Sequence, residues 1–290
     1  MKVFKTIYLI AIITITVLVV GLFGARRFGN WFGFFGGQKM VEAEVDLEPF
    51  KSIELEGDVA DFSIVEGDDY HVEYKYPSNI TVTGNVENDV LKVKVKGKKN
   101  SSTGLFVFDK RGINTVDTTL VVYVPEGTQL DKVDLQIDAG NVKISDFNIN
   151  TLKADCDAAN MELSEITSDN VDLVADAGNL EMDDCIFGDC KMVTSAGNIS
   201  LDHSVVKDLE AETSMGRVEL FSTTFEKGKI NSNLGEISVD GSFNELTAET
   251  DMGKISVECE NLDEAKLDLS VDLGEITVNG LEKGSHFEQD

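Results

Sequence analysis

The chain has 290 residues, 42% of them hydrophobic, and a formal net charge of −28 at pH 7. That apolar fraction can build a core and excludes a wholly disordered chain, while the excess of acid excludes nucleic acid as the expected partner. The acid is concentrated in residues 131–290, which hold 36 acidic and 11 basic residues. We interpret it mainly as a solvated surface, with binding of cations or cationic partners as the alternative.

A membrane-spanning helix is predicted over residues 6–25, after a short N-terminal tail at 1–5. The 20 residues carry no charge, and a helix of that length is about 30 Å long, the thickness of a bilayer core. The apolar run is longer than that of a cleaved signal peptide. The basic charges on the two sides of this segment differ slightly and favour an N-terminus on the cytoplasmic side of the membrane. The sequence therefore predicts a single-pass protein of the cell membrane with an extracytoplasmic C-terminal part.

A linker rich in glycine and aromatic residues follows over 26–40, and we expect its aromatic side chains at the headgroup level of the membrane. Residues 41–135 have strand-like segments with irregular connections. The clearest strands are predicted at 52–56, 62–65, 71–76, 91–95, 119–124 and 133–137, and a polar loop is predicted at 98–104. We interpret 41–135 as an irregular β cap, because a solenoid needs its open end covered.

A repeat of about 19 residues occupies 136–280, and a short acidic tail is expected at 281–290. Each repeat centres on a small residue in a heptad such as DAGNVKI or SMGRVEL, with successive spacings of 19, 19, 19, 19, 19, 18 and 21. A fixed period near twenty indicates stacked supersecondary units. The central positions are Gly140, Ala159, Gly178, Gly197, Gly216, Gly235, Gly253 and Gly274.

Each repeat contains a strand with period two. After Gly140, for example, Val142 and Ile144 are apolar and Lys143 between them is polar, which is typical of a strand with one buried face. A second strand follows later in each unit. The fold class is therefore all-β: a parallel β-solenoid of about eight regular coils, with the irregular N-terminal cap and one preceding transmembrane helix.

The repeat also predicts roles at its corners. Glycine there most simply supplies a positive φ angle, which Ala159 does not suit. The apolar residue before each glycine is expected to point inward. The residue after it is asparagine in four coils, expected to form a hydrogen-bonded ladder. In the next four coils it is Arg217, Glu236, Lys254 and Glu275, which alternate in sign and would pair across neighbouring coils.

Three acids occupy one position in successive coils, namely Asp138, Asp157 and Asp176. The favoured interpretation is that each accepts a hydrogen bond from the backbone two residues on, because Ser195, Ser214 and Asn233 continue the column and suit the same turn. The alternative is a column of carboxylates bridged by Ca²⁺. The four cysteines, Cys156, Cys185, Cys190 and Cys259, are expected as small core residues, with a Cys185–Cys190 disulfide as the alternative.

The stretch TLVVYVPEGTQLDKVDLQIDAGNV, residues 119–142, resembles the signature of the bacterial "putative adhesin" domain-of-unknown-function family, which includes LiaG-like proteins. In that family a strand ending in Val-Pro-x-Gly leads into glycine-centred coils, as Val124, Pro125, Gly127 and Gly140 do here. The resemblance covers roughly residues 45–280. It implies a β-solenoid, frequent linkage to envelope-stress genes and no catalytic residues.

The sequence favours a non-catalytic protein that binds or senses a ligand in the cell envelope. The ligand is an unidentified envelope component or protein. Self-association into a scaffold is the alternative. Cleavage of polysaccharide is less favoured, because residues 131–290 contain no Trp or Tyr for a sugar-binding platform. The spacing of the three histidines indicates no metal set, and no motif indicates a cofactor.

Overall fold

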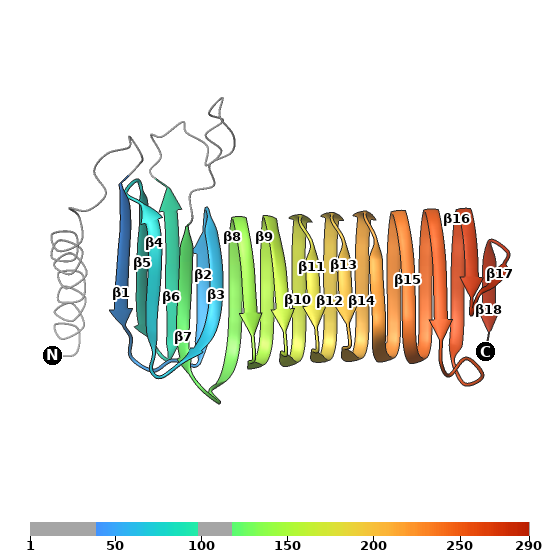
Figure 1. The fold of residues 1–290 in the computed structure, drawn as a ribbon, viewed down its shortest axis with the longest axis horizontal. Coiled ribbons are helices and arrows are strands. Elements are labelled where there is room, and N and C mark those ends of the chain that lie inside the picture. Colours follow the sequence, from blue (N-terminus) through green and yellow to red (C-terminus); the bar gives the residue numbers. More distant parts are fainter. Residues whose placement is uncertain (1–38, 98–117, 290) are drawn as a thin grey trace, which may run out of the picture.

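The computed structural model describes residues 39–97 and 118–289, which form an all-β molecule whose coils follow one another in a row (Figure 1). The predicted tail 1–5 and membrane helix 6–25 lie outside the described residues, as do the linker up to residue 38 and the loop 98–104. Among the residues that are described, no helix is long and apolar enough to cross a membrane.

Seven strands precede the regular coils. They are β1 (Met40–Asp46), β2 (Ser52–Gly57), β3 (Ala60–Gly67), β4 (His71–Pro77), β5 (Ile80–Glu87), β6 (Val90–Gly97) and β7 (Thr119–Pro125). The strands predicted in this region are all present, and the sequence patterns missed β1 and β5. The strands β1, β4 and β5 pair antiparallel with their neighbours, which separates this end of the molecule from the parallel coils.

The coils contain the remaining strands. They are β8 (Gln129–Ser145), β9 (Asn148–Ser164), β10 (Thr167–Ala177), β11 (Leu180–Asp183), β12 (Ile186–Ala196), β13 (Ile199–Asp202), β14 (Val205–Met215), β15 (Val218–Cys259), β16 (Lys266–Val278), β17 (Leu281–Lys283) and β18 (His286–Gln289). Successive coils pair in parallel with a register shift equal to the repeat, so that Leu152 lies beside Val171, and Val171 beside Cys190. The parallel β-solenoid of about eight turns is thus confirmed.

A further coil precedes the regular ones. Strand β2 pairs in parallel with the first half of β8, where Leu55 lies beside Leu135, and β3 pairs with the second half, where Ile64 lies beside Ile144. Ala60 occupies the corner opposite Gly140. The repeat was not visible here, because residues 68–128 separate this coil from the next in sequence and Ala60 replaces the corner glycine.

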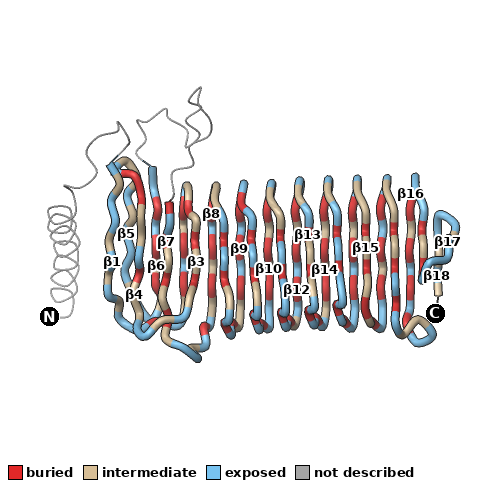
Figure 2. Tube along the Cα trace, in the orientation of Figure 1, coloured by how far each residue is buried: buried red, intermediate tan, exposed pale blue. Residues whose placement is uncertain are grey.

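One continuous hydrophobic core runs the length of the molecule between the two faces of the coils (Figure 2). The alternation predicted for each strand is observed: Val142 and Ile144 are buried and Lys143 between them is exposed. The segment expected as an acidic tail forms β17 and β18, which pair antiparallel with β16 across the last coil. The core is therefore covered at both ends by antiparallel strands, as a solenoid requires.

Candidate binding surfaces

The corner glycines are required by a close approach of neighbouring coils. An ideal Cβ on Gly216 would lie 1.9 Å from the carbonyl oxygen of Gly197, and one on Gly235 would lie 1.7 Å from that of Gly216. The same contact recurs at the other corner glycines, where the distance is 1.7 to 2.0 Å: Gly140, Gly178, Gly197, Gly253 and Gly274. At each of these glycines the coil is stacked so tightly on the preceding one that only a hydrogen atom fits between them.

The expected positive φ is present in part of the column. Gly140, Gly178, Gly253 and Gly274 have φ between 146° and 159°, whereas Gly197, Gly216 and Gly235 have no positive φ. The φ explanation is therefore wrong for these three. At Ala159 the side chain is buried, because the alternation of β9, which is interrupted at Asp157 and Ala158, resumes with Ala159 and continues through Met161 and Leu163. This coil is locally different, as the sequence suggested.

Buried hydroxyl groups stabilise the corners in place of the expected aspartate turns. Thr213 Oγ1 donates to the carbonyl of Gly197 at 3.2 Å, and Ser232 Oγ donates to that of Gly216 at 3.3 Å. The backbone N–H groups of Gly178 and Gly216 donate to the carbonyls of Ala196 and Leu234 in the next coils. They therefore do not bond to the side chains of Asp176 and Ser214 two residues earlier. The turn interpretation is wrong there, because stacking of the coils already satisfies the corner amide.

The asparagine ladder is confirmed. Asn160 Nδ2 donates to Asn141 Oδ1 at 3.2 Å, and the side-chain oxygens of Asn160 and Asn179 accept from the backbone N–H of the next asparagine at 3.0 and 3.1 Å. The charged residues that follow the last four corner glycines form two of the predicted ion pairs. Arg217 lies 3.2 Å from Glu236, and Lys254 lies 3.1 Å from Glu275. This corner is therefore held by side chains as well as by backbone.

Asp138, Asp157 and Asp176 are exposed and stacked in register beside this corner. Partial desolvation, followed by the charge of Asp157, raises the pKa of Asp138. Among the described residues, the groups of acidic, histidine or cysteine side chains that converge within 4.8 Å do not include this column. The geometry thus gives the calcium alternative no support.

The opposite corner was missed by sequence analysis. A residue with left-handed φ, between 49° and 66°, recurs every 19 residues: Asp146, Glu165, Asp184, His203 and Ser222. No glycine marks this corner, so the pattern of residue types did not reveal it. Repulsion from Asp146 is the main cause that raises the pKa of the exposed Glu165.

Two small clusters combine a histidine with carboxylates. One contains Asp183, Asp184 and His203 at the second corner, and the other contains Glu44, His71 and Glu73 in the cap. Nδ1 of His203 lies 3.3 Å from Asp183, and Nδ1 of His71 lies 2.8 Å from Asp69. The carboxylates of both clusters are exposed, and a histidine paired with an acid on the surface is adequately explained as an ordinary ion pair.

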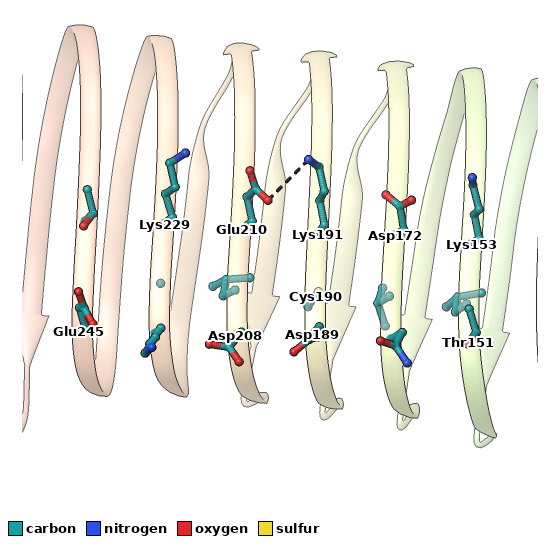
Figure 3. A pocket seen from close by; sticks show the side chains of 17 residues that line it. Thr151, Lys153, Asp172, Asp189, Cys190, Lys191, Asp208, Glu210, Lys229 and Glu245 are labelled. Carbon is teal, nitrogen blue, oxygen red and sulfur yellow. Dashed lines mark ion pairs between the residues drawn. The ribbon is translucent and has the colours of Figure 1, made fainter.

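An open groove of about 810 Å³ crosses one face of the coils from β9 to β15 (Figure 3). One column of side chains along it alternates in charge from coil to coil: Lys153, Asp172, Lys191, Glu210 and Lys229. Lys191 and Glu210 form an ion pair at 3.6 Å. A second column beside it contains Asn170, Asp189 and Asp208, so the groove offers cations, anions and amides at regular intervals.

The cysteines provide no accessible nucleophile. All four are free thiols and buried, so the alternative disulfide between Cys185 and Cys190 is not formed. Burial raises the pKa of Cys156 to about 12 and that of Cys185 to about 11, and a reactive cysteine needs the opposite shift.

The residues before the corner glycines contradict their prediction. Met215, Leu234, Met252 and Leu273 were expected to point inward, but their side chains are 57, 42, 48 and 67% exposed. At this corner the alternation is interrupted between the buried Thr213 and the buried Val218, and the position before the glycine faces the solvent. Four large apolar side chains therefore lie on the surface.

Comparison with known proteins identifies a family and solved structures of similar fold. The model of the family described as Toastrack DUF4097 matches residues 50–289. A crystal structure of a "putative adhesin" from Bacteroides fragilis NCTC 9343 is similar, with a TM-score of 0.52 and 14% identity over 85% of this chain and 100% of the other. A "putative adhesin" from Parabacteroides merdae ATCC 43184 has a TM-score of 0.53 and 15% identity over 84% and 97%. No curated protein matches the chain.

Proposed function

Because this chain belongs to the Toastrack DUF4097 family, a family of unknown function, we propose that it is a non-catalytic binding protein of the bacterial cell envelope. Its similarity in fold to proteins described as adhesins supports a binding role. The observation that carries the proposal is the groove across β9 to β15. Its regular column of lysines and acids suits recognition of an extended partner, whereas catalysis requires a few groups converging on one point.

The groove favours a partner that carries both charges and is at least as long as the column. Five coils from Lys153 to Lys229 span about 19 Å, because neighbouring parallel strands lie ~4.8 Å apart. A short ligand with a single charge would meet as much repulsion as attraction along it. We therefore propose a polar polymer or an extended polypeptide of the envelope with both positive and negative groups.

The binding role is tested with the full-length chain and isolated envelope material. Replacing Lys153, Lys191 and Lys229 by alanine should reduce retention on the envelope fraction by about tenfold or more, because three charged contacts are lost. The matched control replaces Lys143, Arg217 and Lys254 by alanine, which changes the net charge equally on residues outside the groove. Equal loss of retention in both variants would refute the groove as the binding surface.

The location of the protein is the second part of the proposal. We propose that residues 6–25 anchor the chain in the cell membrane with the coils outside, since this stretch has 20 residues without a charge and basic residues on both sides. Protease added to intact cells should then digest residues 39–289. Digestion only after lysis would place the coils in the cytoplasm.

A link to envelope stress follows from the family resemblance alone. If the protein senses damage to the envelope, its synthesis should rise several-fold when cells are treated with an inhibitor of cell-wall synthesis. Quantitative immunoblotting of treated and untreated cells measures this. An unchanged level would limit the proposal to binding.

A further inference from the structure

A ridge of exposed apolar side chains runs along the corner of the last coils. It consists of Met215, Leu234, Met252 and Leu273, each at least 42% exposed. The register places Met215 beside Leu234, and Met252 beside Leu273, while the stacking of Gly253 on Gly235 places Leu234 next to Met252. In the four preceding coils alanine occupies this position, so the large side chains are confined to this end of the molecule.

Two columns of polar side chains flank the ridge. On one side lie Arg217, Glu236, Lys254 and Glu275, whose charges alternate along the coils. On the other side lie Ser214, Asn233, Asp251 and Asp272, which are neutral in the first two coils and acidic in the last two. The order of the charges along the two columns restricts which partner surface can face the ridge.

We propose that the ridge binds the ridge of a second copy of this chain, with the two copies antiparallel. A two-fold axis perpendicular to the ridge, between Leu234 and Met252, opposes Met215 to Leu273 and Leu234 to Met252. The same rotation opposes Arg217 to Glu275 and Glu236 to Lys254. An alternating sequence of four charges is thus complementary to its own reverse, and every cation meets an anion.

The second flank obeys the same geometry. The rotation opposes Ser214 to Asp272 and Asn233 to Asp251, so no two carboxylates face each other. A parallel pair would instead bring the charged column of one copy against the acidic column of the other, placing Glu275 beside Asp272. Like charges in contact are destabilising, and the antiparallel arrangement alone avoids them on both flanks.

Association through this surface should be weak and dependent on salt. Twelve residues on each copy are fewer than the ~20–30 of a standard interface, and each chain carries a net charge of −28. Screening of this repulsion should strengthen the pair as salt rises.

Because the ridge is separate from the groove, this proposal does not depend on the proposed function. If the N-terminus is anchored as proposed, antiparallel pairs would join two opposing membranes.

The test uses the purified full-length chain with one cysteine added to the ridge. Met215→Cys and Leu273→Cys chains, mixed under mild oxidation at ~0.5 M salt, should form a disulfide-linked pair. Each variant alone should form at least tenfold less, because in the antiparallel pair position 215 lies three coils, or about 14 Å, from its counterpart. The native cysteines are buried free thiols, so we expect them to stay reduced under these conditions.

The controls separate this proposal from its alternatives. Adding Leu234→Ser and Met252→Ser to both chains should abolish the cross-link, whereas Ile186→Ser and Val205→Ser, which are similarly exposed at the other corner, should leave it unchanged. The alanine variant of the groove lysines should also cross-link normally, even if envelope binding fails. Linkage of Met215→Cys to itself would show a parallel pair and overturn the proposal. Absence of any link in the mixture, with both variants folded by their melting transitions, would overturn it too.

Discussion

At the scale of single residues, the corner glycines separate two effects that usually occur together. Gly216 has no positive φ but lies against the Gly197 carbonyl, whereas Gly127 has φ of 72° and nothing within 4 Å of the place that a Cβ would take. We expect Gly216→Ala to lower the free energy of unfolding by about 3 kcal/mol or more, because the coils must separate. Gly127→Ala should cost only about 1–2 kcal/mol, from the left-handed backbone. Denaturant melts measure both, and equal losses would refute the close-approach explanation.

The exposed acids of the second corner make the stability of the fold depend on pH in a predictable direction. Repulsion, chiefly from Asp146, raises the pKa of Glu165 above the ordinary 4.5, so the folded state binds this proton more tightly than the unfolded state does. Stability is then lost as pH rises through the ordinary value to the raised one. We expect Glu165→Gln to increase the melting temperature at pH 7, and the increase should vanish below about pH 4.

Glu56 provides the control with the opposite sign. Hydrogen bonds first from Lys94 and then from Lys96 lower its pKa to about 2. Its contribution to stability is therefore complete above the ordinary 4.5 and is lost as pH falls through about 2. Glu56→Gln should lower the melting temperature at pH 7. Shifts of the same sign in the two variants would contradict the assigned causes.

At the scale of elements, the strands that cover the last coil are expected to contribute measurably to stability. Phe287 in β18 packs against the core and lies opposite Leu269, whereas Leu281 in β17 is 64% exposed. We expect Phe287→Ser to cost about 1–2 kcal/mol, because part of a large apolar side chain returns to water. Leu281→Ser should change stability by less than about 0.5 kcal/mol. Similar effects of the two substitutions would show that β18 does not seal the core.

At the scale of the whole molecule, the core is continuous but each coil contacts only its two neighbours. Stability in such a molecule is expected to be lowest near an end. Cys259 lies close to the last coil and Cys190 lies in the middle. In subdenaturing guanidinium, alkylation should therefore modify Cys259 before Cys190, as measured by mass spectrometry of the peptides. Equal rates would show that the molecule opens as a single unit.

The sequence by itself determined the solenoid, its period and the faces of its strands. This was possible because each coil repeats the same local pattern: Val142 and Ile144 in one unit correspond to Met161 and Leu163 in the next. The asparagine ladder and the Arg217–Glu236 pair could be predicted for the same reason, since residues one period apart become neighbours across the coils.

The tertiary structure alone decided what depends on the direction of a side chain or on contact between distant segments. The coil of β2 and β3 emerges only when it pairs with β8, because a long insertion hides the period. Met215 and Leu273 are apolar, so local pattern placed them inside, but the path of the backbone through a corner turns them outward. The groove is a different case: its column from Lys153 to Lys229 repeats every 19 residues and could have been found in the sequence, but only the stacked coils show that it lies along an open groove.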